Sequence, residues 1–209
     1  MIKTYLSDHI HYRFIEDFDP IFHRTKYINE LVRDSETPYV AIWDTDVIIP
    51  PQQISSSVNR LRKKEAHFIF PYQYYFLETS KIIREKFIQT GDVSILKKNE
   101  GKMKKLYTPN PLGGAFFCNK KTYIKIGMEN ENFYGWGRED GERVVRAKIF
   151  GHGFAHVEGP LFHLTHDRGI NSKFHSSRQD DIKMSEVFRI YSMSKDELKE
   201  EVKNWYRNK

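Results

Sequence analysis

Two carboxylates separated by one residue follow an apolar run early in the chain. The segment YVAIW ends at Trp43 and is followed by Asp44-Thr45-Asp46. If this segment is a strand, alternation sends Asp44 and Asp46 to the same side. Carboxylates at the end of a strand in an α/β protein face the crevice where ligands bind, and their oxygens suit magnesium or manganese with its phosphates. The alternative is a polar strand end with an Asx turn, because Asp-x-Asp alone is common.

A second candidate group is the pair His163 and His166 in the segment FHLTHDRG. In an extended segment the two imidazoles point to opposite faces, so both can bind one metal only if the strand bends there. A helix would place them on one side, but Gly159-Pro160 before them and Gly169 after them argue against a helix. The alternative is a pair of solvated loop histidines.

The third candidate group is the stretch FYGWGRED, which ends at Glu139 and Asp140. Its aromatic rings form an apolar wall, and Gly135 and Gly137 allow a sharp turn or a close approach to a ligand. A carboxylate beside such a wall can act as a general base, while the rings bind the C–H surface of a sugar. The alternative is a hydrophobic turn whose acidic residues begin a helix, where anionic groups are favoured.

The three groups together supply what glycosyl transfer from a nucleotide diphosphate to a hydroxyl requires. A cation neutralises the charge that develops on the leaving diphosphate. A carboxylate accepts the proton of the acceptor hydroxyl, and a loop excludes the water that would hydrolyse the donor.

Composition limits the other classes of function. The chain has 209 residues, one cysteine and a formal net charge of +6, and it contains no run of 18 apolar residues. These features predict an intracellular soluble protein without disulfides, in which Cys118 packs in a strand. The mild positive charge, densest at 60–64 and 97–105, suits a nucleic acid, an anionic membrane or a phosphorylated small molecule. No nucleic-acid-binding motif is present, so we do not expect nucleic acid as a partner.

Hydrophobic periodicity predicts alternating helices and strands, and therefore the α/β class. The predicted strands are 12–16, 39–49, 67–76, one that follows the glycine pair within 112–127 and a pair within 155–169. The predicted helices are 19–36, 52–64, 78–90, a short one after 119, 141–150 and 180–206, and the polar stretch 91–110 reads as a mobile loop.

Five segments in order resemble the metal-dependent, inverting glycosyltransferases of the β-1,4-galactosyltransferase type and their bacterial relatives. They are FHRTKYIN, WDTDVIIP, LGGAFFCNKKTYIKIG, FYGWGREDGERVVRAKIFG and FHLTHDRG, which together span about residues 20–170. The resemblance implies a GT-A fold, in three layers with a mixed central sheet. It also implies a catalytic domain at 1–180 and a C-terminal helical extension at 181–209.

The resemblance further implies roles for individual residues. Asp46 and His166 would bind the metal, Mn²⁺ or Mg²⁺, with His163 as a third ligand where vertebrate galactosyltransferases have Met. Asp140 would be the catalytic base and Glu139 would hold the sugar. The donor would be bound by Phe22, Arg24, Asp44 and Trp136, and the sugar or acceptor by Gly113, Gly114, Tyr134 and Arg138.

The chain departs from this family in two places. The family usually has Gly-Gly before Glu-Asp, whereas this chain has Gly137-Arg138. Arg138 could contact an anionic acceptor or fold back on Glu139. The family also begins with a strand, a helix and a second strand that carry much of the nucleoside pocket, and this unit is not found here. We therefore expect an N-terminally shortened fold, either a fragment or a short protein that another subunit completes.

These observations predict an enzyme that moves a hexose or N-acetylhexosamine, galactose-type, from a UDP-sugar to a hydroxyl of a glycan or lipid-linked glycan. Such an enzyme would serve polysaccharide biosynthesis in the cytoplasm of a bacterium. The basic segments 97–105 and 195–209 could rest on the inner membrane face, although solvated charge is the simpler account. Homo-oligomerisation is left open. The alternatives are a catalytically inactive sugar- or nucleotide-binding protein on the same fold, and a metal-dependent hydrolase.

Overall fold

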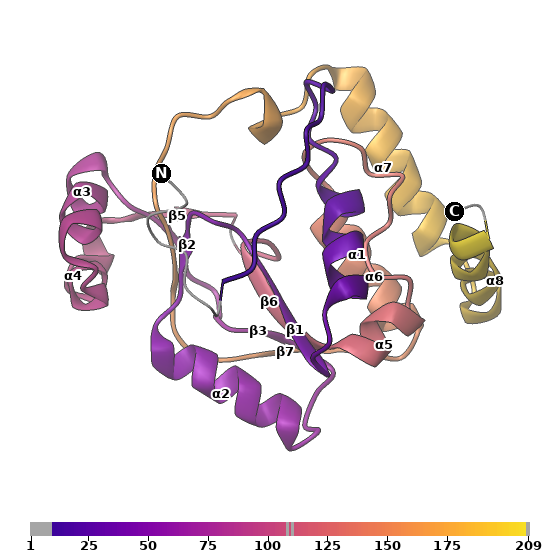
Figure 1. Cartoon of the computed structure of the whole chain (residues 1–209), viewed down its shortest axis with the longest axis horizontal. Helices are drawn as coiled ribbons and strands as arrows, with labels where there is room; N and C mark the ends of the chain where they lie inside the picture. The colour runs from indigo at the N-terminus through magenta and orange to yellow at the C-terminus, as the bar shows by residue number, and fades with distance from the viewer. Residues whose placement is uncertain (1–9, 108, 110, 208–209) are drawn as a thin grey trace.

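Two four-stranded sheets form the centre of the molecule (Figure 1). A computed structural model describes residues 10–107, 109 and 111–207 of the chain. Sheet A has the strand order β1-β6-β3-β7, and sheet B has the order β2-β8-β4-β5. Each sheet contains both parallel and antiparallel pairs. The chain is therefore mixed α/β with mixed sheets, as the sequence predicts.

Sheet A separates two layers of helices. Its strands are β1 (Tyr39–Trp43), β6 (Ala115–Asn119), β3 (Phe68–Phe70) and β7 (Phe154–His156). Successive side chains point to opposite faces of a strand. Phe116 accordingly packs with Val144 of helix α6 (Glu139–Ile149), and Phe117 packs on the other face with Leu61 of helix α2 (Pro51–Arg62).

Sheet B is smaller and carries the ends of the functional segments. Its strands are β2 (Val47–Ile48), β8 (Leu161–His163), β4 (Phe76–Glu78) and β5 (Lys104–Leu106). Strands β2 and β8 are antiparallel, and Val47 lies opposite His163. Strand β4 runs parallel to β8, with Glu78 opposite His163. This register brings residues 46, 78 and 163 to one end of the sheet.

The remaining elements surround the sheets. They are α1 (Arg24–Asp34), α3 (Lys81–Thr90), α4 (Val93–Lys98), η2 (Glu100–Lys102), α5 (Lys120–Lys125), η3 (Ile170–Ser172), α7 (Ser177–Tyr191) and α8 (Lys195–Arg207). In Figure 1, α3 and α4 stand apart from the other helices on the left, and α7 and α8 lie on the right.

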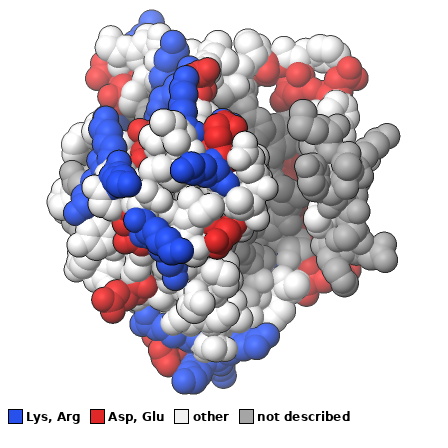
Figure 2. All heavy atoms as spheres, turned by 90° about the vertical axis from the view of Figure 1, so that its left-hand side faces the viewer, with Lys and Arg blue, Asp and Glu red and all other residues white. Residues whose placement is uncertain are grey.

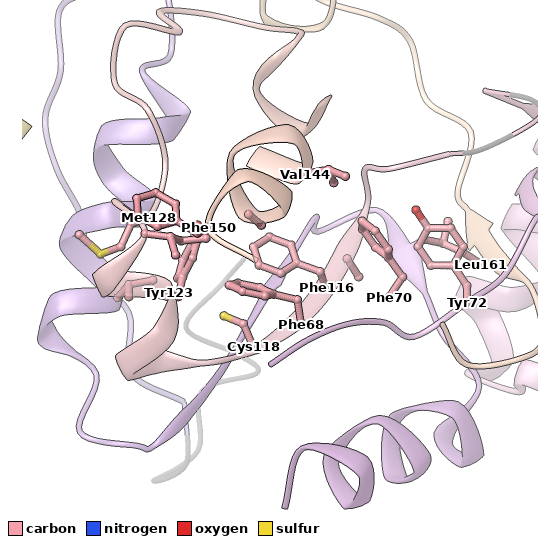
Figure 3. Packing of buried hydrophobic residues seen from close by; sticks show 14 of the residues in the cluster. Phe68, Phe70, Tyr72, Phe116, Cys118, Tyr123, Met128, Val144, Phe150 and Leu161 are labelled. Atoms are coloured by element: carbon pink, nitrogen blue, oxygen red, sulfur yellow. The ribbon is translucent and has the colours of Figure 1, made fainter. Parts of the chain in front are cut away.

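Aromatic rings fill the main core between sheet A and helix α6 (Figure 3). The ring of Phe154 stacks on Phe68 at 4.9 Å and on Phe70 at 4.8 Å between ring centroids. Cys118 is fully buried in this core, and burial raises the pKa of its thiol, so it packs as an apolar group as the sequence predicts.

Several predicted elements differ in the structure. Residues 12–16 form no strand and lie exposed, and Arg13 in this segment pairs with Glu30 and Asp34 of α1. The predicted loop 91–110 contains α4, η2 and β5, whose Leu96 and Met103 build a small core with Phe162. Of the predicted strand 67–76, only β3 at 68–70 and the first residue of β4, Phe76, are in strands, and these two strands belong to different sheets.

The C-terminal part of the chain also differs from the prediction. Strands β7 and β8 belong to different sheets and do not pair with each other. The predicted helix 180–206 is two helices, α7 and α8, that meet near Ser192 and pack Ile190 and Leu198 into the main core. The predicted domain boundary at residue 180 falls inside α7, and the division into two domains stays a prediction. Within the described ranges, no helix has the length and hydropathy needed to cross a membrane.

Candidate active site

One large cavity of about 1210 Å³ opens between helix α1, the end of strand β1, the start of helix α6 and the end of strand β8. Its volume exceeds what a drug-sized ligand usually occupies. The predicted site residues that line it are Phe22, Arg24, Asp44, Asp46, Gly113, Gly114, Trp136, Arg138, Glu139, Asp140, His163 and His166. Residues that lie up to 144 positions apart in the chain therefore face one space.

Asp46, His163 and His166 form a three-residue cluster on the cavity wall. Their ligand atoms all lie within 4.8 Å of one another. Oδ2 of Asp46 is 3.4 Å from Nε2 of His163 and 3.0 Å from Nε2 of His166. The contact with His163 lowers the pKa of Asp46, although burial opposes this, so the carboxylate is ionised at neutral pH. One oxygen and two nitrogens can hold a divalent transition metal.

The local fold explains why these side chains meet. Asp46 directly precedes β2, and the antiparallel register of β2 with β8 brings it beside His163. Strand β8 ends at His163, and the next backbone N–H, that of Leu164, donates to the carbonyl of Asp46 at 2.8 Å. Because Nε2 of His163 and Nε2 of His166 both lie close to Oδ2 of Asp46, the chain bends between the two histidines, which is the condition under which they can face one ion.

Glu78 lies next to the second ring nitrogen, Nδ1, of His163. Its Oε1 lies 3.7 Å from Nδ1 of His163, and this buried nitrogen has no hydrogen-bond partner among the described residues. Carboxylates in such positions orient metal-binding imidazoles by accepting from the second ring nitrogen. The sequence did not reveal Glu78, because only the pairing of β4 with β8 places it there.

Asp44 points to a different partner from Asp46. Strand β1 ends at Trp43, and the chain turns so that the N–H of Val47 donates to the carbonyl of Asp44. Arg24 donates to Oδ1 of Asp44 at 2.6 Å. Burial raises the pKa of Asp44, and the positive charge of Arg24 opposes that shift. The turn thus separates the two carboxylates, with Asp44 paired to α1 and Asp46 facing the histidines.

Glu139 begins helix α6 as a buried carboxyl. Its Oε1 lies 3.8 Å from Nη1 of Arg24, and its Oε2 has no hydrogen-bond partner among the described residues. Burial, with the neighbouring Asp140 carboxylate, raises the pKa of Glu139 to about 7. This side chain can donate a proton in a hydrogen bond near neutral pH, and it is buried against the cavity.

Asp140 is held by a buried arginine that the sequence analysis did not identify. Arg143, fully buried, donates to Oδ1 of Asp140 and makes two further hydrogen bonds to Glu129, at 2.9 and 3.0 Å. Oδ2 of Asp140 faces Gly113, where a methyl group would lie only 2.8 Å away. The spacing of three residues on one helix was the signal that could have linked Arg143 to Asp140.

The aromatic loop before α6 rests on helix α7. The Trp136 ring meets Phe174 edge-on at 5.1 Å, and Lys183 donates to the Trp136 carbonyl at 2.6 Å. Arg138 donates to both carboxylate oxygens of Asp180, at 2.8 and 3.0 Å. Arg138 therefore pairs with α7 and does not fold back on Glu139, although it still lines the cavity.

Two predicted binding residues lie near the entry segment to α1. Phe22 is exposed, and its ring stacks on Tyr27 at 5.5 Å beside the cavity. Tyr134 does not line the cavity, and its hydroxyl donates to Asp19, which raises the pKa of Tyr134 to about 12. Sugar or acceptor binding by Tyr134 stays a prediction.

Comparison with known proteins gives one family match. Residues 96–167 match the sequence model of a family described as the N-terminal domain of galactosyltransferase. This segment covers about a third of the chain and includes Gly113, Gly114, Trp136, Glu139, Asp140, His163 and His166, whereas Asp46 lies outside it. No curated protein matches the chain.

Similar solved structures include glucosyl-3-phosphoglycerate synthase from Mycobacterium tuberculosis. One, in complex with Mn²⁺, UDP and glucosyl-3-phosphoglycerate, has a TM-score of 0.43 and 12% identity and covers 84% of this chain. Another, with Mn²⁺, UDP and phosphoglyceric acid, has a TM-score of 0.46 and 10% identity and covers 85%. The matches span 55% and 56% of those proteins.

Replacing a residue of the three-residue cluster is expected to weaken metal binding. Calorimetric titration of Mn²⁺ into the wild type should show one site. Asp46→Asn or His166→Ala should weaken it by roughly tenfold or more, because the first removes the negative charge of the ligand oxygen and the second removes a ligand nitrogen. Asp167→Asn, which changes an exposed carboxylate next to His166, serves as the matched control. Equal affinities for Asp46→Asn and the control would remove the metal site from this position.

Glu139 is expected to make the protein less stable as the pH rises. In the unfolded chain a glutamic acid has a pKa of 4.5, and in the folded protein that of Glu139 is about 7. Between these values only the folded state keeps the proton, so the free energy of unfolding should fall with rising pH, by about 3 kcal/mol across the window. In urea unfolding, the free energy of unfolding of Glu139→Gln should not show this fall with rising pH. The control Glu158→Gln, at an exposed site, should still show it. Parallel pH profiles for the two variants would contradict the assignment.

Proposed function

We propose that this protein is an inverting, metal-dependent glycosyltransferase of GT-A fold that transfers a hexose or N-acetylhexosamine from a UDP-sugar to a hydroxyl of a glycan or lipid-linked glycan. One observation carries the proposal: the cluster Asp46–His163–His166 and the carboxylate of Asp140 line the same large cavity. The family match over residues 96–167 supports it.

Asp46, His163 and His166 would hold Mn²⁺ or Mg²⁺. A bound divalent cation supplies Lewis-acid stabilisation for the charge that develops on the leaving diphosphate. The residues fit this group, because the ligand atoms are close together, the carboxylate is ionised and the spare Nδ1 of His163 faces Glu78. Two imidazoles beside one carboxylate suit manganese better than an all-oxygen ligand set would.

The nucleotide would lie in the part of the cavity between α1 and β1. That part is lined by Ile28, Val32, Val40 and Ile42, which present an apolar surface for a base. Phe22 lies at its edge with an exposed ring face, and aromatic rings bind nucleobases by stacking. Arg24, held by Asp44, brings a positive charge to the same wall, where the anionic part of a nucleotide would be stabilised.

Asp140 would accept the proton of the acceptor hydroxyl. The acceptor oxygen then forms a bond to C1 of the sugar while the bond from C1 to the diphosphate breaks, which inverts the configuration in a single displacement. Arg143 occupies Oδ1 of Asp140 and leaves Oδ2 facing Gly113 on the cavity wall. The absence of a side chain at residue 113 keeps that oxygen accessible to a hydroxyl.

Glu139 would bind the transferred sugar. Its Oε2 is buried and has no partner among the described residues, and a pKa near 7 lets it donate to or accept from a sugar hydroxyl. Trp136 would add an apolar ring face to the sugar pocket. The galactose-type preference rests on the resemblance and on the name of the matching family alone.

Asp140→Asn is expected to slow transfer strongly while leaving donor binding intact. Turnover with a UDP-sugar should fall about a hundredfold or more, because general-base catalysis contributes at least this factor. The stabilisation of the protein by UDP with Mn²⁺ should stay the same in a thermal-shift assay. Asp181→Asn, an exposed carboxylate on α7, is the matched control.

A screen of nucleotide sugars with and without Mn²⁺ should show turnover only with both present, and the product should have the inverted anomeric configuration. Wild-type protein that binds UDP-sugar with Mn²⁺ but transfers nothing to any acceptor would favour the alternative, an inactive binding protein. Normal transfer by Asp140→Asn would overturn the assignment of the base.

A further inference from the structure

Nearly all of the net positive charge of the chain lies in one compact segment. Residues 81–106 contain eight Lys and Arg residues and three Asp and Glu residues, a balance of +5, whereas the whole chain has a formal charge of +6. The rest of the chain is therefore close to neutral, at +1. This segment comprises α3, α4, η2 and β5, and we refer to it as the basic platform.

The charges of the basic platform face solvent. The exposed basic residues are Lys81, Lys86, Lys97, Lys98, Lys102, Lys104 and Lys105. Figure 2, which views the molecule from the side of α3 and α4, shows Lys and Arg side chains reaching outward across this face. Of the three acidic residues, Glu85 is paired with Arg84 at 2.7 Å. Because the lysines are exposed, they can meet an anionic surface.

Aliphatic side chains are exposed among these charges. Ile82 is 71% exposed and Ile88 is 53% exposed, both on α3, whereas Ile83 and Phe87 of the same helix pack inward. Nearby, Lys105 lies 4.3 Å from the ring centre of Tyr75, which is itself exposed. Moving a large exposed aliphatic side chain out of water lowers the free energy of the system.

The basic platform is a folded surface. Leu77, Ile83, Leu96, Met103 and Phe162 are buried together beneath it. The Ser80 hydroxyl caps α3 by accepting from the N–H of Ile83, and Asp92 caps α4 by accepting from Ser94. The lysines and the exposed isoleucines are therefore displayed on defined elements.

We propose that the basic platform docks the protein on the surface of an anionic lipid bilayer. The lysines bind the lipid phosphates, and Ile82 and Ile88 enter the interface, the combination that peripheral binding requires. A soluble polyanion would satisfy the lysines but offers no apolar phase for the isoleucines. Tyr107, one residue after β5, lines the large cavity, so the basic platform adjoins the cavity wall.

The test is co-sedimentation with vesicles, which needs no turnover and is independent of the proposed function. Wild-type protein should bind phosphatidylcholine vesicles that contain phosphatidylglycerol, should bind weakly to phosphatidylcholine alone, and should be released by salt. The variant Lys97→Gln/Lys98→Gln/Lys102→Gln should bind about a hundredfold more weakly, because each lysine near an anionic bilayer contributes about a fivefold factor. Ile82→Ser/Ile88→Ser should weaken binding further without a change in charge.

The matched control is Arg62→Gln/Lys63→Gln/Lys121→Gln, which removes three exposed charges outside the basic platform. It should bind like the wild type. Equal losses in the two triple variants would overturn the proposal, as would equal binding to both kinds of vesicle. Heparin binding as tight as vesicle binding, together with no effect of the isoleucine changes, would identify the basic platform as a site for a soluble polyanion instead. Thermal unfolding of each variant checks that the fold is kept.

Discussion

The pairing of strand β2 with strand β8 is the interaction on which the candidate site depends. Only two residue pairs form this ladder, Val47 with His163 and Ile48 with Phe162. The backbone bond from Leu164 to Asp46 extends the contact by one residue and coincides with the bend that brings His166 back. Shifting the register by one residue would turn the side chain of His163 to the opposite face. The metal cluster therefore rests on the geometry of a short ladder, which the buried Phe162 and Leu161 hold in place.

A buried network of charged side chains holds Asp140, the carboxylate that lines the same cavity as the metal cluster. Arg143 and Arg146 are both fully buried on α6, and each is paired with a buried carboxylate, Glu129 and Glu142 respectively. Removing one partner of such a pair leaves an uncompensated buried charge, which is strongly destabilising. Arg143 extends this network to Asp140 at the cavity, so the orientation of that carboxylate is linked to the core.

The sequence predicted the local elements better than the contacts between them. The mixed α/β class, the strand before Asp44 and the helix after Arg138 follow from local patterns, and the structure confirms them. Local patterns also indicated that His163 and His166 can bind one metal only if the chain bends between them. They could not show that the bend exists, because it depends on the long-range contact with Asp46. Glu78 was missed for the same reason, since strand pairing decides its role. The spacing of Arg143 from Asp140 is visible in the sequence, but the burial of Arg143 and its pairing with Glu129 are not.

The clearest difference between the prediction and the structure is at residues 91–110, which were predicted to be a loop. Its polar and glycine-containing sequence resembles a mobile segment, yet Leu96 and Met103 pack under α3 and turn it into a folded unit. Two apolar residues in a basic stretch are too weak a local signal to reveal such a unit. The same stretch carries five of the lysines of the basic platform.

The most direct test of the account is to count the nitrogen ligands of a bound manganese ion. Pulsed electron paramagnetic resonance of the Mn²⁺ complex should detect couplings from two imidazole nitrogens, since His163 and His166 face the same carboxylate oxygen. One coupling should disappear in His163→Ala and the other in His166→Ala. A bound ion with no imidazole coupling, or with couplings that both variants retain, would contradict the central claim that these side chains hold one metal beside Asp46.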